Sequence, residues 1–212
     1  MSTSYIPTKF NDPNVKVQMT ALKYRKEQEL TCIEAIKNCL GREHVLELYA
    51  GTGGLTEIYK KNFTIVTTND VNKNANTDFH NTAMNFIKLF LKKENNFPKL
   101  DLIDFDCYGS PALEIQEYFK QRRDFDAPFV LRFSDGLGLW MKRNKNQEVV
   151  KKRYLIDGEL DMTKIWLRHP ELIDAFLKRI AGLYGMQADK IISVQTKFKN
   201  YVLGAYKFTK IQ

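Results

Sequence analysis

Long apolar runs, paired cysteines and clustered histidines are all missing from this sequence of 212 residues. No 18 consecutive residues are apolar, so the sequence predicts no membrane-spanning helix. The first seven residues have neither the basic start nor the hydrophobic stretch of a signal peptide, which favours a cytoplasmic protein. The three cysteines, Cys32, Cys39 and Cys107, form no C-x-x-C pair. We therefore expect neither a disulfide framework nor a bound metal.

Positive charge is in excess. The sequence has 33 Lys and Arg residues against 25 Asp and Glu, a formal net charge of +8, which favours a polyanionic partner. Much of this charge lies in 136–170, which we expect to be a long basic loop or a small insertion beside a ligand crevice. A solvated loop would show the same charge run, so both interpretations stay open. The basic residues predicted to bind substrate are Lys142, Arg143, Lys151, Lys152 and Arg153.

Apolar runs alternate between strand and helix spacing, a pattern typical of a doubly wound α/β fold. With 43% hydrophobic residues the chain can bury one full core, so we expect a single domain over 1–212 with an irregular arm over 1–19. The expected sheet is mostly parallel and seven-stranded, with a C-terminal antiparallel hairpin and helices on both faces. Strands are predicted at 44–49, 63–69, 77–80, 100–105, 128–133, 190–197 and 201–208, and helices at 20–40, 83–93, 111–123 and 171–184.

A glycine-rich corner directly follows the first predicted strand. The apolar run that ends at Ala50 continues into Gly51-Thr52-Gly53-Gly54, where glycines let the backbone approach a ligand closely. The spacing does not fit a dinucleotide fingerprint, because Thr56 occupies the position of the third glycine, nor a phosphate loop, because no lysine precedes Lys60. The next strand ends at Asp70, roughly 20 residues past the first glycine, where a carboxylate can accept both hydroxyls of a ribose.

These features, together with an acid inside the first strand, Glu47, resemble motif I and the second-strand acid of the S-adenosylmethionine-dependent methyltransferases. The resemblance implies a Rossmann-like methyltransferase fold and S-adenosyl-L-methionine as cofactor. A buried strand followed by an ordinary turn would leave the acid at 47 unexplained, since a carboxylate in a core strand is costly unless paired. The cofactor-binding residues that the resemblance implies are Glu47, Tyr49, Gly51, Thr52, Gly53, Asp70, Val71, Asn81, Thr82 and Asp106.

A second motif, Asp104-Phe105-Asp106-Cys107-Tyr108-Gly109-Ser110-Pro111, ends the fourth predicted strand. The amine of a nucleobase is a poor nucleophile, because its lone pair is spread into the ring. A carboxylate that accepts one amine hydrogen localises that pair, and an aromatic ring holds the base by stacking. Asp106 and Tyr108 supply these two groups, and we predict both as catalytic residues. Gly109 lets the loop pass close to the substrate.

The second motif resembles the Asp-x-Asp-Pro-Phe/Tyr-Gly-Ser/Thr-Pro segment of the tRNA guanine-N2 dimethyltransferases. This likeness extends over about 10–138 and implies methyl transfer to guanine N2, with RNA, tRNA in first place, as partner rather than DNA. Cys107 and Gly109 are then predicted to contact the substrate. Two departures stand out: Cys107 replaces the family's proline, and the 212 residues do not span the family's additional C-terminal domain.

Other functions remain open on the sequence alone. The same carboxylate and aromatic pair serves DNA base amino-methyltransferases, which act on flipped-out bases. Methylation of a protein or small molecule, or a non-catalytic nucleic-acid-binding subunit with this fold, are further alternatives. Cys107 has no basic partner in its motif, so its thiol is expected to be protonated and to pack rather than to attack a base.

Overall fold

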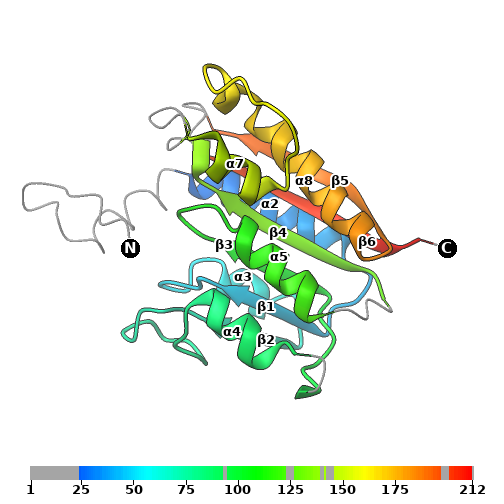
Figure 1. Ribbon diagram of the computed structural model, residues 1–212. Coiled ribbons are helices and arrows are strands. Elements are labelled where there is room, and N and C mark those ends of the chain that lie inside the picture. The colour runs from blue at the N-terminus through cyan, green and yellow to red at the C-terminus, as the bar shows by residue number, and fades with distance from the viewer. Residues whose placement is uncertain are drawn as a thin grey trace, which may run out of the picture.

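The computed structural model describes residues 24–92, 95–122, 127–138, 141, 146–196 and 201–211, so the arm predicted over 1–19 lies outside the described residues. Their strands form one six-stranded sheet in the order β2-β1-β3-β4-β6-β5 (Figure 1). The first four strands pair in parallel, and β6 is antiparallel to both of its neighbours. They are β1 (His44–Leu48), β2 (Ile65–Asn69), β3 (Leu102–Asp106), β4 (Phe129–Asp135), β5 (Met186–Gln195) and β6 (Val202–Lys210).

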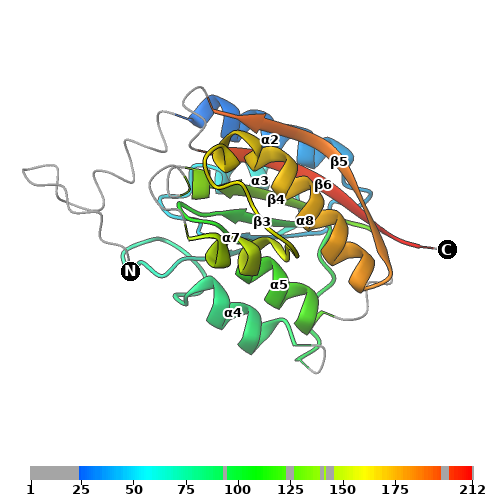
Figure 2. The ribbon, with the colours of Figure 1, turned by 45° about the horizontal axis from the view of Figure 1, so that its top comes forward.

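Helices cover both faces of this sheet (Figure 2). On one face, α2 (Arg25–Asn38) and α3 (Thr56–Lys60) pack on a small apolar cluster that includes Cys32, with Cys39 against its margin. A larger cluster on the other face lies under α4 (Ala83–Phe90), α5 (Ala112–Gln121), α7 (Gln147–Tyr154) and α8 (His169–Leu183). Because both faces are covered, β1 and β4 are buried along their whole length. The predicted α/β class, the mostly parallel sheet and the C-terminal hairpin are confirmed.

The prediction of a seventh strand at 77–80 is wrong within the described residues. This segment contributes only an isolated parallel bridge between Phe79 and Asn69, next to β2. A side chain bonds this edge in place of a ladder at one position: the Asp78 carboxylate accepts hydrogen bonds from the backbone N–H of Thr68 at 2.8 Å and from its hydroxyl at 2.9 Å. The Asp78 side chain and two backbone hydrogen bonds with Phe79 therefore satisfy the end of this edge without a full strand.

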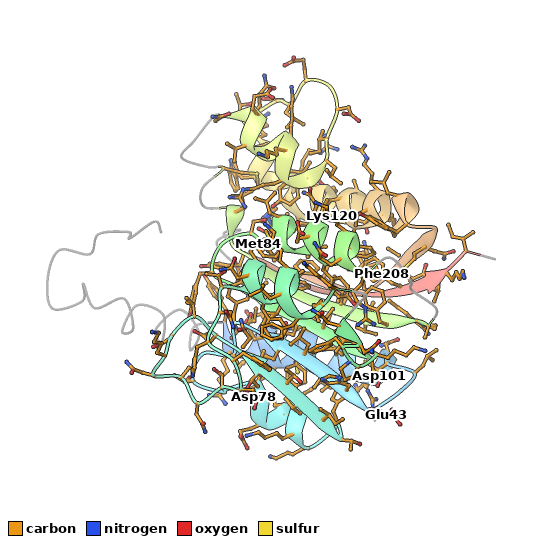
Figure 3. The ribbon with its side chains drawn as sticks, turned by 60° about the horizontal axis from the view of Figure 1, so that its bottom comes forward. Glu43, Asp78, Met84, Asp101, Lys120 and Phe208 are labelled. Atoms are coloured by element: carbon orange, nitrogen blue, oxygen red, sulfur yellow. The ribbon has the colours of Figure 1, made fainter. Side chains whose placement is uncertain are left out.

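At the amino ends of the strands, Asp101 ties β3 to β1. Its carboxylate accepts hydrogen bonds from the backbone N–H groups of Glu43 at 2.8 Å and His44 at 3.1 Å, and Figure 3 shows Asp101 close to Glu43. Gly41 makes this approach possible, because a Cβ there would lie 2.2 Å from an Asp101 oxygen. The clamp holds the register in which Glu47 faces Asp104 across the ladder.

The segment 136–170 is more helical than a long basic loop. Its described residues include all of α7 and the 3-10 helix η2 (Ile165–Arg168), and α8 already begins at His169. Lys151, Lys152 and Arg153 therefore lie on α7, whereas Lys142 and Arg143 lie outside the described residues. The chain between two strands is long enough here for helices to cover the sheet, and Pro170 in the first turn of α8 favours its start. No helix in the described ranges combines the length and apolarity needed to cross a membrane.

Candidate cofactor and acceptor cleft

A cleft of about 840 Å³ opens at the carboxyl ends of β1, β2 and β3. In open α/β sheets, ligands bind at this edge, beside the strand where the chain order reverses, which here is β1 between β2 and β3. The volume is near the upper end of the about 300–1,000 Å³ typical of small-molecule sites. Nine of the residues predicted from the sequence line the cleft: Glu47, Tyr49, Gly51, Thr52, Asp70, Val71, Asp106, Cys107 and Tyr108.

The glycine-rich corner after β1 shapes one end of the cleft. Gly51 and Gly53 have φ values of 55° and 83°, a left-handed conformation that glycine adopts without strain. The corner is bound to the end of β2, because one Asp70 oxygen accepts the N–H of Gly51 at 2.8 Å and the other accepts the N–H of Asn72 at 2.7 Å. A carboxylate has about four acceptor positions, so two remain for the hydroxyls of a ligand.

Glu47 lines the cleft but is only 2% exposed. Its carboxylate accepts a hydrogen bond from the hydroxyl of Thr56 at 2.6 Å. Burial, reinforced by the charge of Asp104, raises the pKa of Glu47 to about 8. The carboxyl therefore holds a proton near neutral pH, and a cation bound in the cleft would favour its ionised form.

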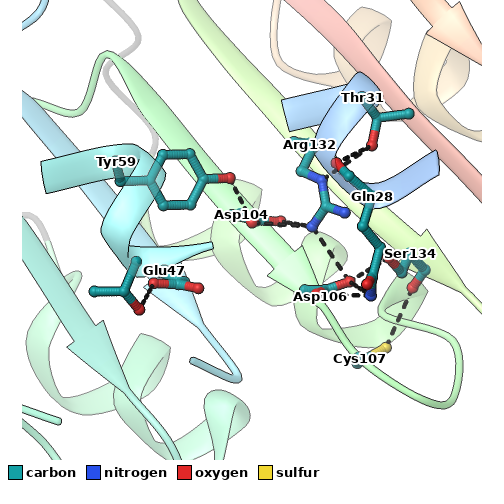
Figure 4. Close-up of polar contacts among 10 residues, drawn as sticks. Gln28, Thr31, Glu47, Tyr59, Asp104, Asp106, Cys107, Arg132 and Ser134 are labelled. Carbon is teal, nitrogen blue, oxygen red and sulfur yellow. Dashed lines mark hydrogen bonds and ion pairs between the residues drawn. The ribbon is translucent and has the colours of Figure 1, made fainter. Parts of the chain in front are cut away.

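Behind the cleft, a buried arginine bridges two aspartates (Figure 4). Arg132 on β4 is fully buried, and its Nη1 lies 2.8 Å from an Asp104 oxygen and 3.2 Å from an Asp106 oxygen. Tyr59 donates a hydrogen bond to Asp104 at 2.5 Å, and Arg132 Nε donates one to Thr31 at 3.3 Å. Burial raises the pKa of Asp104 to about 6, although the guanidinium opposes the shift.

Asp106 is held from three directions. In addition to the ion pair with Arg132, its Oδ1 accepts a hydrogen bond from the Ser134 hydroxyl, and its Oδ2 accepts one from Gln28 Nε2 at 3.1 Å (Figure 4). The side chain keeps 16% exposure toward the cleft. Sequence reasoning missed these three partners. A signal was present for two of them, because Arg132 and Ser134 share one face of β4 and pair in register with Asp104 and Asp106.

The thiol of Cys107 is buried beside Asp106 and donates to the Ser134 carbonyl at 3.5 Å. Burial, with the negative charge of Asp135 and other nearby carboxylates, raises its pKa well above the usual range. A protonated, buried thiol is a poor nucleophile. The geometry therefore favours the packing role that the sequence predicts for this residue.

Several predicted site residues do not line the cleft. Gly53 lies within the corner, where its N–H donates to the Ala50 carbonyl at 2.9 Å. Thr82 caps α4, and the backbone of Asn81 is bound in both directions by the side chain of Asn69. Their contact with the cofactor stays a prediction. The carbonyl of Gly109 accepts the N–H of Gly136 at 2.7 Å, and the basic residues of α7 also lie outside the lining.

Comparisons with known proteins bear on the fold. Neither a family model nor a curated protein matches the sequence. Among solved structures, Trm1 from Pyrococcus horikoshii in complex with S-adenosyl-L-methionine aligns with a TM-score of 0.61 at 16% identity, over 88% of this chain and 56% of that one. The plantazolicin methyltransferase BpumL in complex with SAH aligns at 0.53 and 13% identity, over 95% and 92%. The related BamL, with SAH and a triazolic desmethylPZN analog, aligns at 0.52 and 11% identity, over 94% and 92%.

The chain thus has the Rossmann-like methyltransferase fold, as the resemblance implied. At these identities the likeness extends to the fold alone. The chain also spans only 56% of the length of Trm1, so the activity of that whole protein does not transfer with the fold.

Proposed function

We propose that this protein is an S-adenosylmethionine-dependent methyltransferase that acts on an exocyclic amine of a nucleobase, guanine N2 in tRNA or another RNA. The observation that carries the proposal is the shared cleft: Asp106 and Tyr108 line the same cavity as Gly51 and Asp70. The proposed donor site and the proposed acceptor group therefore share one cleft, as methyl transfer by proximity and orientation requires.

The residues present fit the donor. Asp70 and the corner at Gly51 would hold its ribose, and Glu47, whose carboxyl a bound cation would ionise, suits a ligand with positive charge on sulfur and on an amino group. When bound, S-adenosylmethionine supplies a methyl group that is already activated. Many solved neighbours of the same fold contain this compound or SAH, which supports the assignment.

Asp106 is suited to hold the acceptor amine. Its Oδ1 is engaged by Ser134 and Arg132, while Oδ2 accepts from Gln28 and retains a position for one more hydrogen. By accepting one amine hydrogen, this oxygen would orient the nitrogen and localise its lone pair. The buried guanidinium keeps the carboxylate in place while it does so.

RNA is the proposed polymer for two reasons. The net charge of +8 and the basic turn of α7 at Lys151, Lys152 and Arg153 favour a polyanion. The segment from Asp104 to Pro111 resembles the corresponding motif of the tRNA guanine-N2 dimethyltransferases, and Trm1 is among the structures of the same fold.

The proposal is tested by incubating the protein with labelled S-adenosylmethionine and separate pools of tRNA, ribosomal RNA and DNA, then identifying the modified nucleoside. We expect label in an amino-methylated base of RNA. The Asp106→Asn variant should lower kcat by about 100-fold or more, with the donor Kd changed by no more than a few fold.

A matched control is Asp174→Asn on α8, since Asp174 also pairs with a hydroxyl, Tyr206 at 2.9 Å, and a cation, Lys178 at 2.9 Å, but lies outside the cleft. It should leave kcat unchanged. A parallel loss of donor binding in Asp106→Asn would reassign that residue to the donor site, and label in DNA alone would replace the proposed polymer.

A further inference from the structure

Tyrosines from three distant segments meet at the Asp106 end of the cleft. Tyr24 precedes α2, Tyr108 follows β3, and Tyr201 precedes β6, and all three line the cavity with Asp106. The ring centroids of Tyr24 and Tyr201 lie 5.3 Å apart at an interplanar angle of 47°. Tyr108 is 44% exposed and stands at the mouth of the cavity.

Gly136 holds Tyr201 in this position. A Cβ at residue 136 would lie 2.2 Å from the Tyr108 carbonyl oxygen and 2.6 Å from the ring of Tyr201. The N–H of Gly136 also donates to the Gly109 carbonyl at 2.7 Å. The absence of a side chain at residue 136 therefore lets the loop after β3 and the ring of Tyr201 both approach the end of β4 closely.

The charge of the cleft is opposite to the charge of the protein. Four acidic residues line it: Glu29, Glu47, Asp70 and Asp106. Glu47 holds a proton near neutral pH and Glu29 is paired at 2.7 Å with Arg25, the basic side chain within the described lining, so the negative charge of the wall comes from Asp70 and Asp106. Phosphate groups would be repelled from such a wall. A neutral aromatic ring with amine hydrogens would instead find stacking partners and a carboxylate acceptor.

We infer that Tyr201, with Tyr24 and Tyr108, forms the acceptor subsite, which admits one neutral, amine-bearing base while the phosphates of the polymer stay outside the cleft. This inference rests on the proposed function. It adds the residues that bind the base and the reason why an amine-bearing base is selected. Selection follows from chemistry: the Asp106 oxygen accepts a hydrogen from an amine, whereas a carbonyl at the same position would face it with a second acceptor.

The inference is tested by equilibrium titration of the SAH-saturated protein with guanosine, adenosine and inosine. Inosine lacks the N2 amine of guanosine and carries oxygen in place of the N6 amine of adenosine, so it is the matched comparison for both. We expect at least one amine-bearing nucleoside to bind about 10-fold or more tightly than inosine. If guanosine, adenosine and inosine bind with equal affinity, the inference that the cleft selects an amine-bearing base is overturned.

Variants then test the tyrosines. Tyr201→Leu should weaken binding of the preferred nucleoside by about 5- to 150-fold, the loss typical of a base-stacking ring. Tyr201→Phe should restore it, because the ring face is kept. Tyr184→Leu is the matched control, since that tyrosine packs against Phe119 outside the cleft lining, and it should bind like the wild type.

The SAH Kd of each variant separates the possible failures. If wild-type protein binds neither S-adenosylmethionine nor SAH, the proposed function itself fails. If SAH binds normally and Tyr201→Leu keeps full nucleoside affinity, the tyrosine subsite fails while the proposed function stands. Methylation of a lysine peptide with all nucleosides inert would show that the acidic cleft selects a cationic amine, which also overturns the inference.

Discussion

Glu47 has opposite effects on stability and on the proposed activity. Its pKa is raised from 4.5 to about 8 by burial and by the charge of Asp104, so the folded protein holds a proton that the unfolded chain has already released. Stability from this residue is complete below pH 4.5 and is lost as the pH rises toward about 8. An acid kept at such a cost is typical of a functional site.

Glu47→Gln should therefore stabilise the protein at alkaline pH. The amide oxygen can still accept from Thr56, while the buried charge is removed, so we expect a gain of roughly 1–3 kcal/mol at pH 9 and little change at pH 5. Urea unfolding at the two pH values measures the effect. A variant that is equally destabilised at both would show that the carboxylate is stabilised by a partner, contrary to the raised pKa.

The affinity for the donor should depend on the same proton in the opposite direction: it should rise with pH, whereas the contribution of Glu47 to stability falls. The sulfonium of S-adenosylmethionine favours ionised Glu47, so we expect its affinity to rise by up to about tenfold per pH unit up to a pKa of about 8. SAH lacks the sulfonium charge and should give a shallower slope. Calorimetric titrations at pH 6 to 9 measure how the affinities for S-adenosylmethionine and for SAH change with pH. In Glu47→Gln, the two affinities should depend on pH in the same way.

At the scale of elements, the end of β4 joins the two halves of the site. Asp135 accepts hydrogen bonds from the hydroxyl of Ser110 at 2.8 Å and from Tyr154 on α7 at 2.9 Å, and it lies 3.2 Å from His169 on α8. These contacts fasten the loop after β3 to both helices. The position of Tyr108 therefore depends on elements that follow it by many residues.

Gly136→Ala tests this junction. The added Cβ would collide with the Tyr108 carbonyl and the Tyr201 ring, and we expect a loss of stability of roughly 1–3 kcal/mol. Gly109→Ala is the matched substitution for stability, because a Cβ there meets nothing within 4 Å. It should change the unfolding free energy by less than about 1 kcal/mol. Equal effects in chemical denaturation would contradict the tight contact at residue 136.

Across the whole molecule, an excess of positive charge coexists with a cleft that acidic residues line. The net charge is +8, yet the residues that line the cavity include four acids, of which Glu47 holds a proton near neutral pH. Long-range attraction of a polyanion and local repulsion of its phosphates are compatible if binding occurs on the outer helices and only one base enters. The basic turn of α7 is the predicted part of this outer surface.

Reversing two charges on α7 should weaken nucleic-acid binding. For Lys151→Glu with Lys152→Glu, we expect a higher Kd for RNA and a shallower dependence of log K on log salt, because fewer counterions are released. Lys60→Glu with Lys61→Glu is the matched control, since these adjacent lysines end α3 on the opposite face of the sheet. Filter binding at several salt concentrations provides both slopes. Identical slopes for the two variants would remove α7 from the binding surface.

The parts of the site that the sequence predicted are those carried by local pattern. Glu47, Gly51, Asp70 and Asp106 each lie in or directly after an apolar strand, and the carboxyl ends of parallel strands share one edge of a sheet. Their meeting in one cleft follows from strand order alone. The sequence pattern at 77–80 did not reveal that no full strand forms there, because the Asp78 side chain, next to Phe79, bonds the edge of β2 in place of a backbone ladder.

The sequence by itself determined the class of fold, the glycine-rich corner after β1 and the two acids at the strand ends, since spacing along the chain and the periods of strand and helix are local properties. Only the tertiary structure decided what surrounds Asp106. Gln28 is 78 residues from that carboxylate, and Tyr24 meets Tyr201 across most of the chain. Such contacts depend on how α2 and β6 pack on the sheet, and packing between distant segments leaves no regular period in the sequence.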